Sequence, residues 1–401
     1  MSEWKKVRLG DISIDGGHYG IGAAAVEYDE SLPTYLRITD IREDGTIIRE
    51  SLKSVDDPDA CEYYLKPNDL VIARTGASTG RNYFYDGRDG QLVYAGFLIR
   101  FSIDERKIWP PYVKYWFQGS EYRTWLLNHT DGSTRANINA VTLGDCPIYC
   151  PTDVSTQRRI AAILSSLDDK IENNRKICAN LEAQAQAIFK SWFVDFEPFG
   201  GKMPQGWKMG KLGDVAELMR QTITPNEMVE VVEHYSLPAY DEAHYPAYDN
   251  SNNIKSNKFK VGKDSILVSK LNPAIKRLWD PFFDTETAVA STEFVVIDPR
   301  DKRNRYFVYG VLDSPAFYAY AKSNVSGTTN SHQRISPEQI LCFETVLPDE
   351  KWIEKFCDAV SPMYWGIKKR IKESRALAAT RDALLPKLMS GEVDVEKVKV
   401  A

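Results

Sequence analysis

The segment Leu164–Trp192, which reads LSSLDDKIENNRKICANLEAQAQAIFKSW, decides the fold of this 401-residue chain. Apolar or small residues recur in it at alternating spacings of three and four, the a/d pattern of helices that pair in a coiled coil. Ser155 is placed to cap the first amides of this helix, and Pro198-Phe-Gly-Gly201 ends it. The recurring positions are Leu164, Leu167, Ile171, Asn174, Cys178, Leu181, Ala185, Ile188 and Trp192. We therefore expect a long helix here that packs against a partner helix.

The same pattern returns 196 residues later in the chain, where it predicts a second helix. Pro386 and Ser390-Gly391 are expected to mark the end of this helix. Its seam positions are Val360, Met363, Ile367, Arg370, Ser374, Leu377, Arg381, Leu384 and Leu388.

Polar residues interrupt the two apolar seams at equivalent positions, Asn174 with Arg370 and Cys178 with Ser374. Such residues either fix the pairing register or, if each helix turns slightly, face solvent. The order domain–helix–domain–helix favours antiparallel pairing about a pseudo-twofold axis. A helix of about 35 residues is about 50 Å long, so the pair would form a rigid spacer between two domains.

A second repeat opens each half of the chain. Trp4-Lys-Lys-Val-Arg-Leu-Gly-Asp-Ile12 returns as Trp207-Lys-Met-Gly-Lys-Leu-Gly-Asp-Val215, with five of nine positions identical. Further on, Asp69-Leu-Val-Ile-Ala-Arg74 and Asp264-Ser-Ile-Leu-Val-Ser-Lys270 each predict a buried strand. The interiors otherwise differ. This contrast favours one scaffold that presents two different recognition surfaces, although duplication followed by neutral drift gives the same pattern.

These features predict an α+β chain with an internal pseudo-twofold repeat, in which two long antiparallel coiled-coil helices separate two globular domains of mixed β-sheet and helices. The expected boundaries are a first globular domain at 1–150, a first helix at 151–195, a linker at 196–206, a second globular domain at 207–347, a second helix at 348–390 and a tail at 391–401.

The composition and motifs exclude several functional classes. The six cysteines form no Cys-x-x-Cys pair, so a zinc site is not expected. The phosphate-binding motif Gly-x-x-x-x-Gly-Lys-[Ser/Thr] does not occur in the chain. Asp280-Pro-Phe-Phe283 lacks the second proline of an adenine-methyltransferase motif. No apolar stretch approaches the roughly 20 residues of a membrane helix. We expect a cytoplasmic protein that is not an enzyme.

The ordered set of motifs resembles the specificity subunits of type I restriction-modification systems. The paired openings carry this resemblance, together with Asp264–Pro273 and Gln157–Ile171. The resemblance implies two target-recognition domains, each reading one half of a split DNA site. It also implies that the two helices set the gap between the halves and dock the modification subunits.

The resemblance further implies a set of partners. These are double-stranded DNA, two modification subunits that use S-adenosylmethionine to methylate adenine, and restriction subunits that use ATP and Mg for translocation and cleavage. This chain would then bind no cofactor, metal or membrane itself. Its net charge of −5 fits such a complex, because the modification subunits would contribute cationic surface. The alternative is a duplicated coiled-coil scaffold without DNA recognition, which the acidic composition favours.

Small-polar loops with embedded cations are the candidate DNA-binding segments, because their side chains read base edges and glycine allows close approach. The same loops also suit ordinary protein surface. In the first domain the candidates are Arg74, Thr75, Ser78, Thr79, Arg81, Asn82, Ser133, Arg135 and Asn137. In the second they are Lys270, Asn272, Lys276, Arg277, Thr329, Asn330, His332 and Gln333. For helix pairing and partner docking they are Leu164, Leu167, Ile171, Asn174, Leu181, Ile188, Val360, Met363, Ile367, Arg370, Leu377 and Leu384.

Overall fold

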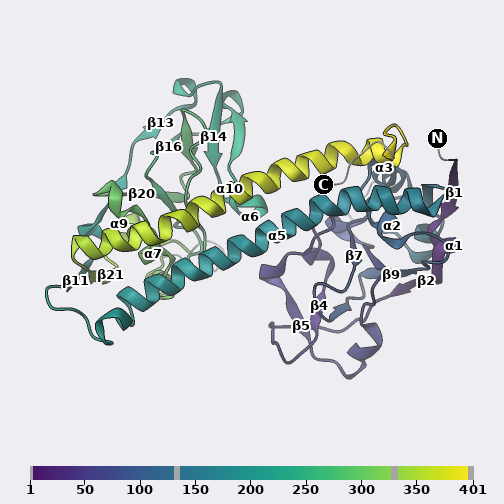
Figure 1. The fold of residues 1–401 in the computed structure, drawn as a ribbon, viewed down its shortest axis with the longest axis horizontal. Helices are drawn as coiled ribbons and strands as arrows, with labels where there is room; N and C mark the ends of the chain where they lie inside the picture. The colour runs from purple at the N-terminus through teal and green to yellow at the C-terminus, as the bar shows by residue number, and fades with distance from the viewer. Residues whose placement is uncertain (1–2, 131–135, 327–332, 396–401) are drawn as a thin grey trace. The chain divides into compact units, whose positions relative to one another are not determined.

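The computed structural model describes residues 3–130, 136–326 and 333–395 of the chain. The chain divides into two compact units, unit 1 (Met1–Ile171 with Ala376–Ala401) and unit 2 (Glu172–Arg375). Each unit contains a sheet-rich domain and part of two 40-residue helices, α5 (Val154–Phe193) and α10 (Glu350–Met389) (Figure 1). Among the described residues, no helix has the length and apolar character needed to cross a membrane. The expected α+β class is confirmed.

The described part of unit 1 contains three sheets, with strand orders β1-β10, β2-β9-β6-β7 and β3-β5-β4-β8. Its helices are α1 (Leu9–Ile12), α2 (Pro110–Trp116), α3 (Ser120–His129) and α4 (Ala140–Gly144). Its strands are β1 (Trp4–Arg8), β2 (Ser13–Tyr19), β3 (Ala25–Val26), β4 (Thr34–Leu36), β5 (Lys53–Val55), β6 (Asp69–Ala73), β7 (Asn82–Tyr85), β8 (Leu92–Tyr94), β9 (Leu98–Ile103) and β10 (Pro147–Pro151).

The described part of unit 2 has sheets ordered β11-β21, β12-β20-β17-β18 and β13-β16-β19-β14-β15. The first two match sheets of unit 1 in strand order, and the third has five strands in a different order. Its shorter helices are α6 (Leu237–Ala243), α7 (Arg305–Asp313), α8 (Pro315–Ser323) and α9 (Pro337–Leu341). Its strands are β11 (Lys208–Lys211), β12 (Ala216–Met219), β13 (Thr222–Ile223), β14 (Val231–Tyr235), β15 (Ala247–Asn250), β16 (Lys258–Val261), β17 (Ile266–Ser269), β18 (Leu278–Trp279), β19 (Ala288–Ala290), β20 (Phe294–Pro299) and β21 (Glu344–Leu347).

The repeated openings of the two halves form the strands β1 and β11. Strand β1 pairs antiparallel with β10, and β11 pairs antiparallel with β21. Because β10 and β21 lead directly into α5 and α10, each opening motif holds the start of its domain beside the start of the long helix that follows. This shared role explains why the opening motif is repeated in the two halves of the chain.

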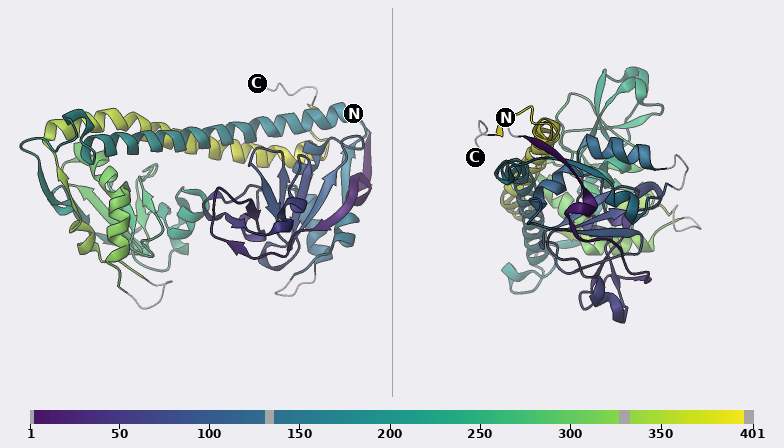
Figure 2. Two further views of the ribbon diagram at one scale, coloured as in Figure 1. Left: turned by 90° about the horizontal axis from the view of Figure 1, so that it is seen from below. Right: turned by 90° about the vertical axis from the view of Figure 1, so that its right-hand side faces the viewer.

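The two long helices pack against each other inside each unit (Figure 2). In unit 1, Ile160 and Leu164 of α5 share a buried cluster with Leu388 of α10. In unit 2, the Phe189 ring of α5 lies 5.8 Å from the Phe356 ring of α10. Early residues of α5 thus meet late residues of α10, and late residues meet early ones. The paired segments are antiparallel in both units.

A polar contact lies within the apolar seam of unit 2. Asn174 is 2% exposed. Its Nδ2 donates to Glu373 Oε2 at 3.1 Å and to Ser374 Oγ at 3.3 Å. Of the two alternatives for Asn174, the structure therefore has it facing the partner helix. Arg370 instead donates to the carbonyl oxygen of Gly366 in its own helix at 3.3 Å.

The ends of the long helices differ in detail from the sequence-based expectation. Asp153, rather than Ser155, accepts hydrogen bonds from the first amides of α5, including that of Thr156 at 3.0 Å. The hydroxyl and amide donors of Ser155 and Thr156 lower the pKa of Asp153 to about 2. Pro386 lies inside α10, which continues to Met389 and stops before Gly391, a residue with φ of 75°.

In unit 1, ion pairs join the domain to α5. Asp168 of α5 accepts hydrogen bonds from Lys114 at 2.7 Å and from Arg381 of α10 at 2.9 Å, and these side chains are largely buried. Burial alone would raise the pKa of Asp168, but the two cations outweigh it and hold that pKa below 3.8. The neighbouring pair, Asp169 with Arg88, is 2.6 Å long and about half exposed.

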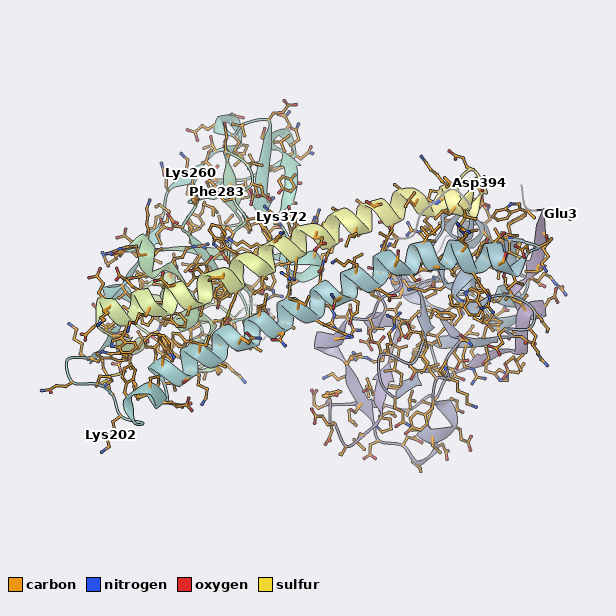
Figure 3. The ribbon with its side chains drawn as sticks, in the orientation of Figure 1. Glu3, Lys202, Lys260, Phe283, Lys372 and Asp394 are labelled. Carbon is orange, nitrogen blue, oxygen red and sulfur yellow. The ribbon has the colours of Figure 1, made fainter. Side chains whose placement is uncertain are left out.

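In unit 2, the loop between β18 and β19 makes the corresponding attachment to α10, with the charges reversed. Lys368 of α10 pairs with Asp280 of the loop at 2.7 Å, and Lys372 pairs with Asp284. Figure 3 marks Lys372 on α10 and Phe283 in this loop. The fully buried carboxylate of Glu233 accepts the amides of Phe283 and Asp284 at 2.8 and 2.6 Å, which fixes the loop backbone.

Asp168→Asn should lower the free energy of unfolding by about 3 kcal/mol, because it removes the carboxylate that Lys114 and Arg381 share and leaves Arg381 only its pair with the exposed Asp382. Since the folded-state pKa of Asp168 is lowered, this contribution is complete at neutral pH and is lost as the pH falls below 3.8 through the folded value. Urea unfolding at neutral and acid pH measures it.

The matched control is Asp169→Asn, whose half-exposed pair with Arg88 should contribute less than about 1 kcal/mol. Equal losses for the two variants, or a loss for Asp168→Asn that does not shrink at acid pH, would contradict the buried ion-pair account.

Candidate nucleic-acid interface

In unit 1, three backbone hydrogen bonds build the candidate site at the end of the central strand β6. The amide of Arg74 donates to Phe97 O at 3.0 Å, and the amide of Ile138 donates to Arg74 O at 2.9 Å. The amide of Gly76 donates to Ala136 O at 3.0 Å. The strand end, the turn before β9 and the segment before α4 are thus held together.

The same three hydrogen bonds recur in unit 2, at the end of β17. The amide of Lys270 donates to Glu293 O at 3.0 Å, that of Ile335 to Lys270 O at 3.1 Å and that of Asn272 to Gln333 O at 2.8 Å. Positions in the strand segments correspond by a shift of 196, as from 74 to 270, and those after the loop by 197, as from 138 to 335. The two units therefore share one backbone frame, with a loop one residue longer in unit 2.

The cationic candidates of unit 1 differ in how they are held. The Arg74 guanidinium lies 4.9 Å from the centre of the Tyr19 ring, and its Nε has no hydrogen-bond partner among the described residues. Arg81 donates to Ile41 O at 3.3 Å and lies 3.6 Å from Glu43. Both side chains remain partly exposed.

The uncharged candidates of unit 1 divide into surface and internal residues. Thr75 and the exposed Asn137 form a β-bridge, and Thr79 Oγ1 donates to Ala136 O at 3.0 Å. Ser78 and Asn82 are buried, and Asn82 Nδ2 donates to Phe117 O at 3.0 Å. Asn82 thus has an internal role and Ser78 is inaccessible in the structure, so neither is carried forward as a proposed DNA contact. The remaining candidates, Ser133 and Arg135, lie outside the described residues.

In unit 2, internal ion pairs engage two of the predicted cations. Arg277 makes two hydrogen bonds to Asp241, at 2.6 and 2.8 Å, and its side chain is only 12% exposed. Lys276 pairs with Asp313. We withdraw Arg277 as a DNA contact, because a base would have to displace this carboxylate.

The other candidates of unit 2 lie on the shared frame or outside the described residues. Lys270 and Gln333 are partly exposed. Asn272 has a φ of 47°, and its Oδ1 is buried without a partner among the described residues. Thr329, Asn330 and His332 fall in a segment that the structure does not describe.

Other side chains also lie on this face. Phe97, which is not among the predicted contacts, is 59% exposed, and Tyr19 is 43% exposed. In unit 2, Arg334 makes two hydrogen bonds of 3.1 Å to Glu293, which raise the pKa of Arg334. A signal was available for Phe97: it follows Gly96 directly before a buried strand, at a turn.

The predicted helix residues lie along the α5–α10 seam or beside it. Buried among them are Leu164, Asn174, Val360 and Ile367. Partly exposed are Leu167, Ile171, Leu181, Ile188, Met363, Arg370, Leu377 and Leu384. Trp365 of α10, which was not predicted, is 72% exposed, an unusual state for so large an apolar side chain.

Comparison with known proteins shows which proteins the chain resembles. Residues 1–183 match the family model described as the type I restriction modification DNA specificity domain. The MjaIX specificity subunit of a type I restriction enzyme from Methanocaldococcus jannaschii is 27% identical, over 84% of this chain and 81% of that protein. The HindI specificity subunit from Haemophilus influenzae is 22% identical, over 98% of this chain and all of that protein (100%).

A solved structure shares the fold. The type I restriction-modification S subunit from M. genitalium superposes with a TM-score of 0.54 at 15% identity, covering 96% of each chain. Among the described residues, no group of three or more His, Cys, Asp or Glu side chains is arranged to hold a metal ion. Along most of its length the chain is thus similar to specificity subunits of type I restriction enzymes, and its first 183 residues match a DNA specificity domain.

Proposed function

We propose that each sheet-rich domain reads one half of a bipartite site in double-stranded DNA. The observation that carries this proposal is the shared backbone frame with unlike side chains. Arg74 and Phe97 occupy one copy of the frame, and Lys270 and Glu293 occupy the other. Because base edges are distinguished by the side chains that reach them, one frame with two side-chain sets suits two different half-sites.

The long helices suit a role in fixing the gap between the two half-sites. Each of α5 and α10 is one continuous 40-residue helix, about 60 Å long, and contributes to both units. Half-sites read from one face of DNA lie about 34 Å apart or at multiples of that distance. Two paired helices bend less than a single helix, so they would keep the distance between the half-sites constant.

We further propose that the exposed faces of these helices dock two modification subunits, which use S-adenosylmethionine to methylate adenine. Restriction subunits that use ATP and Mg would complete the complex, and its work on DNA would take place in the cytoplasm. Exposed Trp365 supports the docking proposal, because tryptophan is enriched among the residues that carry binding energy at protein interfaces. A scaffold without a DNA role is disfavoured, since the matched family model describes a DNA specificity domain.

Arg74→Ala should weaken DNA binding about tenfold and relax the reading of one half-site only, because a single base contact is lost. Lys270→Ala, at the equivalent position of the frame, should relax the other half-site only. The readout is sequencing of methylated adenines in cells that express each variant with its modification subunit. If either variant relaxes the specificity for both half-sites equally, the assignment of one half-site to each domain is wrong.

Insertion of seven residues into both helices, after Ile171 in α5 and after Arg375 in α10, should lengthen the gap. Seven helical residues add about 10 Å, which is about three base pairs, and keep the seam facing the partner. Mapping of methylated adenines gives the gap directly. An unchanged gap in the doubly extended protein argues against the helices as a ruler. The same insertion in α5 alone, the control, should disrupt pairing.

Trp365→Ala should weaken the association with the modification subunit by at least about tenfold, because large anchors dominate interface energetics. Tyr306 supplies the control, since its ring stacks on that of Tyr364, the residue before Trp365, with 4.7 Å between the ring centres. Tyr306→Phe keeps this aromatic ring and leaves the indole exposed, so it should retain association in a sedimentation or co-purification titration. Full association of Trp365→Ala would exclude this face as the docking site.

A further inference from the structure

Three side chains of unit 1 gather on one face of the sheet β2-β9-β6-β7. The amide of Arg74 donates to Phe97 O, so these two residues lie opposite each other where β6 and β9 approach the turn. Tyr19 of β2 pairs with Ile99, two residues along the strand from Phe97. Since opposite residues and residues two apart share a face, Tyr19, Arg74 and Phe97 project to the same side. The 4.9 Å stacking of Arg74 on Tyr19 agrees with this.

The backbone beneath the Phe97 ring is held by hydrogen bonds along the whole turn. The amide of Ala95 donates to Leu36 O at 3.0 Å, and that of Gly96 donates to Ile21 O at 2.7 Å. The amide of Leu98 then closes the turn on Ala95 O at 2.8 Å. An exposed phenyl group therefore stands on a fixed support, which lowers the entropy cost of using it in binding.

The equivalent position in unit 2 has the opposite chemistry. Glu293 occupies the place of Phe97 on the frame, and its carboxylate accepts two hydrogen bonds from Arg334 at 3.1 Å. Lys270 takes the place of Arg74. The same backbone frame therefore holds a charged residue, Glu293, where unit 1 has Phe97. Packing of the domain does not require an apolar side chain at this position. We therefore attribute the phenylalanine of unit 1 to a role of the exposed surface and not to the stability of the fold.

We propose that Phe97 is a specificity-determining residue of the first domain, which contacts the C5-methyl group of a thymine next to the base pair contacted by Arg74. This inference rests on the proposed function. A phenyl ring cannot hydrogen-bond a base edge, and the thymine methyl is the apolar group that the major groove offers. Arginine beside it is the usual partner of guanine in the same groove.

The test uses the full chain in complex with its modification subunit and duplexes that carry the methylated motif of the complex. Each thymine of the two half-sites is replaced in turn by deoxyuridine, which lacks only the methyl group. At one position in the first half-site, the replacement should weaken binding by wild type about fourfold. Phe97→Ala should bind both duplexes equally, which removes the discrimination.

Two further variants make the result specific to Phe97. Phe97→Leu keeps an apolar side chain and should retain most of the discrimination, which separates loss of the contact from loss of folding. Glu293→Ala, at the matched position of unit 2, should retain it fully. Discrimination that persists in Phe97→Ala, or a wild-type complex indifferent to every deoxyuridine, would overturn the inference. Absence of any sequence-specific binding by wild type would instead overturn the proposed function.

Discussion

The antiparallel packing of α5 on α10 is the interaction on which the rest of the structure depends. Each unit closes its core with segments of both helices, so neither domain is completed by its own stretch of sequence alone. The first domain needs Leu388 from the far end of the chain. Buried Asn174, bonded to Glu373 and Ser374, adds a polar contact that only one register satisfies. Within unit 2 the two helices therefore have a defined pairing, and each domain is attached to the helix segments of its own unit.

Attachment to the helices and the proposed recognition of DNA use different parts of each domain. The opening strands β1 and β11, the ion pairs of Asp168 and the loop fixed by Glu233 hold the domains to their helices. The frame at the ends of β6 and β17 presents the side chains that differ between the units. Because these parts are separate, the exposed side chains of the frame can change without loss of the attachment. This arrangement explains why two halves with matching openings have unlike interiors.

The sequence predicts the fold well because periodicity reports burial directly. The alternation of three and four from Leu164 onward identified α5 to within a few residues, and the run beginning at Asp69 identified β6. The site was predicted less well, since a polar side chain in a loop looks the same whether it faces solvent or a distant carbonyl. Asn82 bonds to Phe117, which is 35 residues away, and Arg277 bonds to Asp241, which is 36 residues away. No local pattern contains such partners.

Two domains on one pair of helices should recognise two separate half-sites in DNA. The most direct measurement is the sequencing of methylated adenines in cells that contain this chain and its modification subunit. The account predicts one motif made of two defined half-sites, separated by a constant number of unspecified base pairs. A single uninterrupted motif, a gap that varies from site to site, or no adenine methylation at all would contradict it.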